Sequence, residues 1–555
     1  MLILAGALAL AAGGWYLLSR ERPCEFEYRC EVSGENQLKV TVSVTNSWFS
    51  KGRTYEFPVT DQVVSWEEDA AAETSGSGAS LYVGRGQTES LTYQVTLGQS
   101  GKHGAQGTAG ESFCVFDGLH ALLLPAEAYV EGIPSDEVLM SRLSVVLEVP
   151  EGWSAVNPFE QMEHVTWPDL YDLTNDCFAM GRFVTAELTS EEGGVLRVHT
   201  AENGWQPEEQ DQEALLSLLD YYIGLFGIEK EYDVIFLPSD TAVIGGAGRH
   251  SVGASFDPEE SRDWELLSHR MFHAFLDSRV RGQSIHQAPL LWLAEGLATY
   301  YENMALQSLP ETVKNQFGWE KDRQLADLYD QYLYMRYKEP LLYQIEPEEE
   351  ADLMSQAQVE FLHYIQAPLT VAWLEEETGK ENAVLSDLLE HYDEGAYSVR
   401  DMTGRLLGSE EAERAWDAYF AGTEVLPLWQ LGTVSREPEE ILANLNEAEI
   451  TLGSWLDDEL GYYPIETMSL EGLETLKESG QLDRVSYADE ETEEYISQYA
   501  ETIDSLLREN CLRAELSGNE ADDPMTRYEV LGNEEVAEAW KSWISGGCKT
   551  PFQIE

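Results

Sequence analysis

The sequence predicts an α+β multidomain protein with a β-sandwich-like N-terminal domain. Its 555 residues are more than one hydrophobic core usually holds. From Cys24 to about Thr200, apolar residues alternate with polar ones over short segments, which is typical of strands. From Glu208 onward the apolar residues follow a helical spacing instead. A β-rich domain over residues 24–203 is therefore expected to precede mainly helical domains.

The chain is strongly acidic. Its 102 Asp and Glu residues outnumber 34 Lys and Arg residues, which gives a net charge of −68. Such a field repels nucleic acid and anionic lipid surfaces, so neither is expected as a partner. With 43% hydrophobic residues, the chain is globular rather than disordered. A solvated acidic surface accounts for the charge excess without any specific partner.

The first 18 residues, Met1–Leu18, form an apolar run just long enough to span a bilayer. No basic residue precedes the run, unlike the start of a secretory signal peptide. Arg20 and Arg22 follow it and favour an internal location, although large domains are exported despite such charges. We expect residues 1–19 to be a single-pass anchor in the cell membrane with an extracytoplasmic domain behind it. A cleaved signal is the alternative.

Six cysteines occur, and none forms a C-x-x-C motif, which argues against a zinc ribbon or a thioredoxin-like site. In an exported protein, Cys24 with Cys30 and Cys511 with Cys548 are possible disulfide pairs. Buried free thiols are the alternative, and the sequence does not choose between the two.

Three segments of the N-terminal domain alternate most clearly, and Gly, Ser and Asp clusters separate them, which predicts an antiparallel sandwich. Their apolar positions are Leu38, Val40, Val42 and Val44; Leu91, Tyr93, Val95 and Leu97; and Leu143, Val145, Leu147 and Val149. The segment Glu208–Phe226 is instead expected to be an amphipathic helix that ends at Gly227. Tyr232–Leu237 follows as a buried strand. The apolar stripe of the helix consists of Leu215, Leu216, Leu219, Tyr222, Ile223 and Phe226.

Two histidines and a glutamate have the spacing of a metal site. His269 and His273 are four residues apart in a helical segment, so both imidazoles lie on one face, one turn apart. Glu295 lies in a second helical segment, Leu290–Tyr301, which can return a carboxylate to that face. Two nitrogens and one carboxylate, with a fourth position open, are the ligands of a catalytic zinc rather than a structural one.

These motifs resemble those of the gluzincin metallopeptidases, in which H-x-x-x-H is followed by a W-x-x-E-G-x-x-x-Y helix. Here that helix reads L-W-L-A-E-G-L-A-T-Y-Y, from Leu291 to Tyr301. The glycyl aminopeptidase and aminopeptidase N families are the most similar. The resemblance implies a thermolysin-like gluzincin domain over 205–345 and an α-helical domain over 346–430. It also implies a zinc cofactor and leaves 431–555 unassigned.

One departure from these families concerns the chemistry directly. They carry H-E-x-x-H, in which the glutamate is the general base that activates the zinc-bound water. This chain has Arg270 at that position, and arginine does not accept a proton. A guanidinium beside a metal ion is also repelled by it, unless Arg270 points away. The resemblance therefore implies a peptidase fold whose general base is missing.

Two further positions are compared with the families. The glycine-rich segment that contains Gly246, Arg249 and His250 stands where they have a substrate-binding edge strand with a glutamate for the substrate amine. Arg249 takes the approximate place of that glutamate; a turn without a ligand is the alternative. Tyr364 matches a tyrosine that stabilises the oxyanion in active relatives, and a packed helical tyrosine is the alternative.

Two other groups in the sequence could supply metal ligands. His286 lies in the connection between the two ligand-bearing helices and is expected to be a loop residue, because Glu295 already supplies the third ligand. The acidic segment Glu346–Glu350 is expected to be a solvated turn rather than a second metal site.

The sequence leaves three functions open. The first is a catalytically impaired gluzincin homologue that binds a peptide or protein ligand in the former active-site cleft. The second is an active zinc aminopeptidase that uses a substituted base, for which Glu302 and Glu265 are the candidates. The third is a metal-free structural surface module. Metal content and the shape of the cleft distinguish them.

Overall fold

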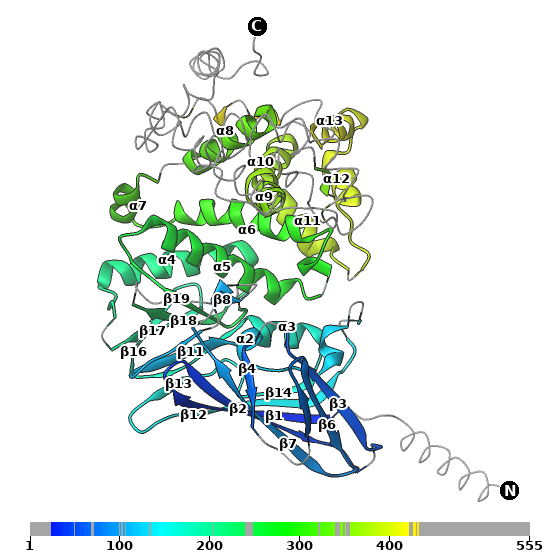
Figure 1. Ribbon diagram of the computed structural model, residues 1–555. Helices are drawn as coiled ribbons and strands as arrows, with labels where there is room; N and C mark the ends of the chain where they lie inside the picture. The colour runs from blue at the N-terminus through cyan, green and yellow to red at the C-terminus, as the bar shows by residue number, and fades with distance from the viewer. Residues whose placement is uncertain are drawn as a thin grey trace, which may run out of the picture. The chain divides into compact units, whose positions relative to one another are not determined.

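A computed structural model describes residues 24–434 apart from short gaps, the longest of which is 239–247. Mixed sheets come first in this part of the chain and helices follow (Figure 1), so the prediction of an α+β multidomain protein is confirmed. The chain forms two compact units. One takes in Met1–Gln283 and Ser308–Val313, and the other takes in Ser284–Gln307 and Lys314–Glu555. The domain ranges expected from the sequence stay predictions.

The expected anchor, Met1–Leu18, lies outside the described residues, as does nearly all of 431–555. Within 24–434, none of the helices combines the length and the apolar character that a membrane crossing requires.

The sequence leaves a disulfide or buried free thiols open for Cys24 and Cys30, and the structure has the free thiols. Both residues lie in strand β1 (Cys24–Gly34), where both thiols are free and buried. Six residues along a strand separate two Cα atoms by about 20 Å, whereas a disulfide needs about 4.4–6.8 Å. Cys114 and Cys177 are also free and buried. Cys511 and Cys548 lie outside the described residues.

Six strands form the largest sheet, in the order β14-β12-β1-β2-β7-β4. The bounds of the other five are Gln37–Thr45 (β2), Val64–Trp66 (β4), Thr88–Thr96 (β7), Met140–Glu148 (β12) and Gln161–Val165 (β14). The pairs are antiparallel except for β1 with β12, which is parallel. The prediction of a wholly antiparallel arrangement is therefore wrong at this pair. The long connection before β12 makes the parallel return possible.

The predicted alternation is confirmed in this sheet. Leu38, Val40, Val42 and Val44 are fully buried in β2, and Leu91, Tyr93 and Val95 are buried in β7. In β12 the pattern ends earlier than predicted, because the strand stops at Glu148 and Val149 is exposed.

Two smaller sheets share one hydrophobic core with the largest sheet, which makes this region sandwich-like as predicted. The three-stranded sheet has the order β3-β6-β5, and the four-stranded sheet has the order β10-β11-β15-β13. Their bounds are Arg53–Pro58 (β3), Ala72–Ser75 (β5), Gly78–Val83 (β6), Thr108–Ala109 (β10), Phe113–Asp117 (β11), Ser154–Val156 (β13) and Cys177–Gly181 (β15). Two further strands, Ser100–Gly101 (β8) and Gly104–Ala105 (β9), form a hairpin.

A second four-stranded sheet, of order β16-β17-β18-β19, supports the helix that carries the histidine pair. Its strands are Phe183–Thr189, Val195–Ala201, Glu231–Leu237 and Ser251–Ser255. The first pair is antiparallel and the other two are parallel. Helices α4 (Glu209–Phe226) and α5 (Ser261–Arg279) lie side by side over it in Figure 1. The predicted order of helix, strand, strand and histidine-bearing helix is thus confirmed.

Helix α4 begins and ends as its sequence indicates. The side chains of Glu208 and Asp211 accept hydrogen bonds from backbone groups of the first turn, which satisfies donors that have no helical partner. Gly227 ends the helix with a left-handed φ of 64°, which glycine adopts without strain. The predicted apolar stripe is confirmed except that Leu218, rather than Leu216, is buried.

The helices after α5 are mostly short. They are α6 (Leu291–Leu306), α7 (Glu311–Phe317), α8 (Arg323–Lys338), α9 (Gln356–Glu360), a π-helical turn (Phe361–Gln366), α10 (Ala367–Thr378), α11 (Ala383–His391), α12 (Val399–Leu407) and α13 (Glu410–Phe420). In α6, Gly296 lies against Ala367 at the start of α10, where a Cβ on the glycine would meet the Ala367 Cβ at 2.3 Å. This close approach explains why a residue without a side chain follows Glu295.

We expect Gly296→Ala to lower the free energy of unfolding by about 1–3 kcal/mol, because the added methyl group overlaps Ala367. Urea unfolding followed by circular dichroism measures the change. The matched control is Gly224→Ala in α4, where a Cβ meets no atom within 4 Å. That variant should gain about 0.5–1 kcal/mol from helix propensity. Equal stability of the two variants would contradict the proposed contact.

Candidate metal centre

Helix α5 presents His269 and His273 on one face, as the four-residue spacing predicts. Their Nε2 atoms are 3.2 Å apart. Two donors bound at about 2.1 Å in a tetrahedral zinc site are roughly 3.4 Å apart, so this separation suits a shared metal ion. Two imidazole nitrogens that face each other require a proton on one of them or a shared cation. The pair therefore fits a metal without rearrangement of the helix.

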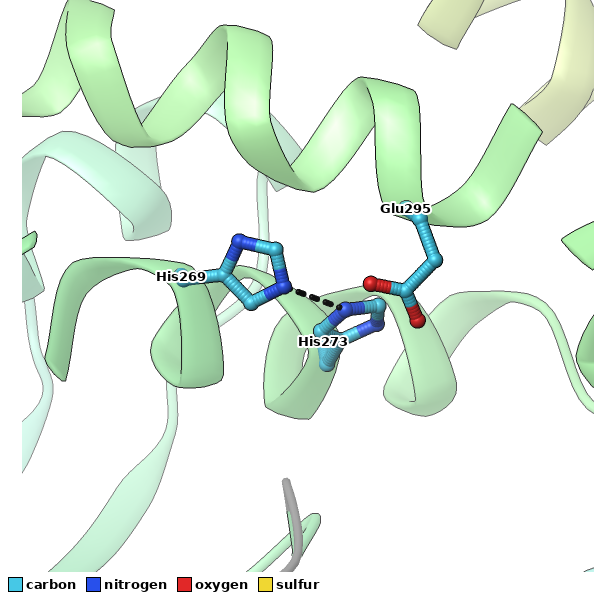
Figure 2. Close-up of side chains that lie close together, drawn as sticks. All are labelled: His269, His273 and Glu295. Atoms are coloured by element: carbon cyan, nitrogen blue, oxygen red, sulfur yellow. Dashed lines mark hydrogen bonds between the residues drawn. The ribbon is translucent and has the colours of Figure 1, made fainter. Parts of the chain in front are cut away.

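Glu295 completes a group of three possible ligands. The possible ligand atoms of His269, His273 and Glu295 all lie within 4.8 Å of one another. Figure 2 shows the Glu295 carboxylate directed towards His273. His273 is buried, while the other two residues are partly exposed. The predicted ligand set is therefore brought together, and its donor types are those of zinc sites that keep an open position.

The packing of α5 fixes the direction of the histidines. Beside the histidines, Phe272 and Phe275 contact Tyr222 and Phe226 of α4. The Tyr222 hydroxyl donates to the backbone carbonyl of Ser268, at 2.9 Å, one residue before His269. A helix held by its packed aromatic side chains keeps one orientation, so the direction of the histidine side chains depends on this core.

His286 lies in a short 3₁₀ helix, Ser284–His286, and is not among the three residues of the metal group. The expectation for the acidic segment is wrong at Glu350. This residue is buried, and its carboxylate bonds with Nε2 of His363 at 2.7 Å. A solvated turn does not bury a carboxylate; the histidine partner makes burial possible.

Arg270 does not contact the histidine pair in any recorded bond. Its guanidinium donates to the backbone carbonyl of Gly253 in β19, at 3.3 Å. The residue is partly exposed, and desolvation by the surrounding protein lowers the pKa of its guanidinium below the ordinary value. Even so, an arginine remains protonated at any physiological pH. Neighbours on a helix are about 100° apart, so Arg270 leaves α5 on a different face from His269.

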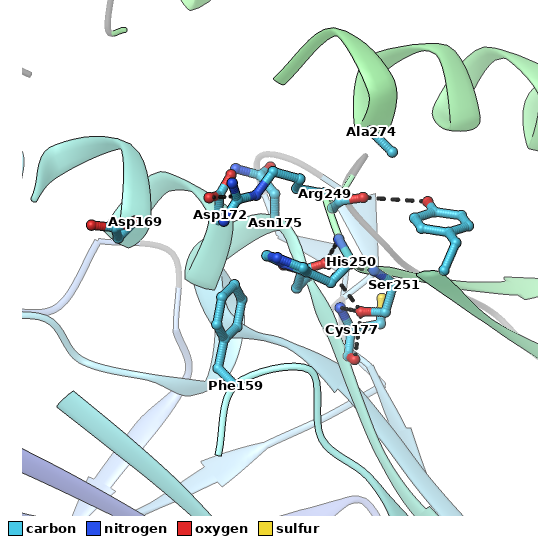
Figure 3. A network of polar contacts seen from close by, with 12 residues as sticks. Phe159, Asp169, Asp172, Asn175, Cys177, Arg249, His250, Ser251 and Ala274 are labelled. Atoms are coloured by element: carbon cyan, nitrogen blue, oxygen red, sulfur yellow. Dashed lines mark hydrogen bonds and ion pairs between the residues drawn. The ribbon is translucent and has the colours of Figure 1, made fainter. Parts of the chain in front are cut away.

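A buried network holds the segment that leads into β19 (Figure 3). Asp176, which follows α3 (Trp167–Asn175), is fully buried. Its carboxylate accepts from the backbone N–H groups of His250 and Ser251, both at 2.7 Å, and bonds with Nδ1 of His250 at 2.9 Å. These bonds fix the start of the strand, since each satisfies a polar group that would otherwise be buried alone.

Arg249 belongs to the same network. Its Nε lies 2.9 Å from a carboxylate oxygen of Asp172, and Arg281 donates to the same oxygen at 2.8 Å. The predicted substrate-binding residues Arg249 and His250 thus have partners within the fold, and their contact with substrate stays a prediction. Gly246 lies outside the described residues. The sequence did not indicate roles for Asp172 and Asp176, because their partners are more than 70 residues away along the chain.

Tyr364 lies in the π-helical turn and is 38% exposed. Its ring packs against that of His363, with centroids 5.9 Å apart. The turn ends at α10, where Pro368 lacks the N–H that a regular helix would use, so the hydrogen-bond pattern changes here. The oxyanion role of Tyr364 stays a prediction.

The buried network around Asp172 predicts how stability depends on pH. Burial raises the pKa of Asp172 to about 8, although Arg249 and Arg281 oppose the shift; Asp277 and Asp176 add to it. Between about pH 4 and pH 8 the folded protein therefore keeps a proton that the unfolded chain releases, and stability falls as pH rises. In Asp172→Asn this contribution is absent. The advantage of the native protein over the variant should shrink as pH rises from 5 to 7.5, by at most about 1.4 kcal/mol per pH unit.

Urea unfolding at several pH values measures this difference. The control is the exposed Asp401→Asn, whose difference from the native protein should be constant over the same range. A native advantage that grows with pH in Asp172→Asn would show that the two arginines dominate over burial.

No protein-family model matches the chain, and no curated protein matches it. Among solved structures, it is similar to an aminopeptidase N family protein from Idiomarina loihiensis, with 12% identity and a TM-score of 0.46 over 76% of this chain and 75% of that one. It is also similar to an M1 zinc metallopeptidase from Deinococcus radiodurans, with 16% identity and a TM-score of 0.46 over 74% and 96%. At these scores the likeness assigns no activity, and the proposals below depend on the residues of this chain.

Proposed function

We propose that this chain is a metallopeptidase-like protein that holds zinc but hydrolyses peptides poorly or not at all, and that it binds a peptide or protein ligand near the metal. The observation that carries the proposal is the group formed by His269, His273 and Glu295, with possible ligand atoms within 4.8 Å of one another. An arginine, Arg270, directly follows the first of these ligands.

The donor set supports zinc. Two imidazoles and one carboxylate are typical of sites with a fourth position open to substrate. Zinc held there would act as a Lewis acid on a peptide carbonyl. Tyr364 would supply a hydroxyl that donates to the oxygen of that carbonyl as negative charge develops on it. Binding and polarising a peptide thus need no residue that the chain lacks.

The proton transfer does need such a residue. Hydrolysis requires a group that takes a proton from the attacking water and delivers it to the leaving amine. Arg270 only donates hydrogen bonds, and one of its guanidinium N–H groups donates to the Gly253 carbonyl. Of the candidate substitutes, Glu265 forms an ion pair with Arg262 at 3.4 Å, and Glu302 is buried in α6. Removal of a general base typically lowers a rate by about 10²–10⁴-fold.

We expect about one zinc ion per chain to copurify with the protein. His269→Ala should abolish stoichiometric zinc, because two remaining ligands rarely hold the ion tightly. Elemental analysis of protein never exposed to chelator or to a polyhistidine column gives the content. His286→Ala is the control and should keep its zinc, since His286 is not part of the group. Absence of zinc from the native protein would favour the metal-free structural module.

Turnover of a panel of short peptides tests the loss of catalysis. The native protein should show negligible hydrolysis, whereas Arg270→Glu should raise it by restoring a carboxylate one residue after His269. His273→Ala in the Arg270→Glu background is the control and should remove the gain. Robust, chelator-sensitive turnover by the native protein, lost in His273→Ala, would falsify the impaired reaction and favour an active aminopeptidase with a substituted base.

A further inference from the structure

A cavity lies beside Arg270, on the side of α5 that faces β19. Val252, Ala254 and Ser255 of β19 line it together with Asp263, Leu266, Leu267 and Arg270 of α5. The helical residues have the spacing of one face, so they form a continuous wall. Leu266 is partly exposed at 36%, which places one side of the cavity near solvent. Most of the lining is aliphatic, and the guanidinium is its one cationic group.

The guanidinium in this cavity has no anionic partner among the residues that the structure describes. Its hydrogen bond goes to the Gly253 carbonyl. A guanidinium has five N–H donors. A charge removed from water without a counter-ion is costly, so buried arginines are normally paired. The network around Asp172 shows the contrast, since Arg249 and Arg281 both contact one carboxylate there.

Asp263 is not an ion-pair partner of Arg270. Its carboxylate accepts from the backbone N–H of Asp257, at 2.8 Å, and so holds the turn before α5. It lines the same cavity and attracts the guanidinium from a longer distance. A ligand that enters the cavity therefore meets one cation at hydrogen-bond range and one fixed anion farther away.

We infer that this cavity binds the C-terminal carboxylate of a short peptide, with Arg270 as its hydrogen-bond donor and the aliphatic wall as the seat of the last side chain. The inference deepens the proposed function and rests on it, because it names the class of ligand that the metallopeptidase-like site takes. The planar guanidinium fork matches a carboxylate and allows two parallel hydrogen bonds.

The cavity favours a carboxylate over a phosphate. Asp263 repels a dianion more strongly than a monoanion, and the net charge of −68 adds to this repulsion. Val252, Leu266 and Leu267 offer apolar contact that a free phosphate does not use. A peptide C-terminus brings one negative charge and an apolar side chain together, which suits both features.

Calorimetric titration of the full-length, zinc-loaded protein with Ala-Ala-Leu and with its C-terminal amide tests the inference. The acid should bind about tenfold or more tightly than the amide, because only the acid forms charge-assisted bonds with Arg270. In Arg270→Gln this ratio should fall to about one. Asp263→Asn should tighten binding of the acid. The control Arg262→Gln, an exposed arginine of the same helix, should leave the ratio unchanged.

The outcomes separate this inference from the proposed function. Equal binding of acid and amide, or no binding of either, in protein that holds one zinc per chain would overturn the carboxylate site and leave the metal site standing. A persistent preference for the acid in Arg270→Gln would also overturn it. Acetate bound as tightly as the peptide would overturn the peptide as the ligand. Should Arg270→Gln not fold, Arg270→Lys replaces it, and its ratio should fall because lysine lacks the fork.

Discussion

The burial of one face of α5 against α4 is the interaction on which the rest of the site depends. Phe272 and Phe275 lie among the aromatic side chains of α4, and Tyr222 bonds to the backbone beside the first histidine. With that face fixed, helical geometry alone directs His269 and His273 to one side. It directs Arg270 to another side. The metal ligands and the arginine are therefore held by the same core on adjacent faces of one helix.

A second constraint acts from the sheet. Asp176 accepts the backbone N–H groups at the start of β19 and so fixes the register of the strand with β18. Gly253, two residues farther on, then offers its carbonyl to Arg270. A Cβ at Gly253 would lie 3.2 Å from Sγ of Cys177, so the close approach of β15 also depends on glycine at this position. The cavity beside Arg270 is thus a product of strand register as much as of the helix.

Features that depend on near neighbours in the chain were predictable from the sequence. The alternation in β2 and β7, the helix that ends at Gly227 and the histidine pair all follow from local periodicity and capping. The second helical segment indicated Glu295 as the third ligand, and the resemblance to gluzincins agreed with it. The parallel pairing of β1 with β12, the acceptors at Asp172 and Asp176 and the burial of Glu350 were not predictable. Each of these depends on a partner that only the tertiary fold brings near, and a hydrophilic residue looks the same in sequence whether it is solvated or buried with a partner.

The residue at position 270 bears on both the loss of hydrolysis and the binding of a carboxylate. A glutamate there would offer a proton acceptor one residue after His269, whereas arginine offers only donors and a positive charge. One substitution therefore removes the group that hydrolysis needs and supplies a group that recognises a carboxylate. Because the guanidinium rests on the Gly253 carbonyl, its charge is held towards β19 rather than towards His269 and His273. This placement limits repulsion of a cation on the histidines, so retention of zinc and loss of the base are physically compatible in one site.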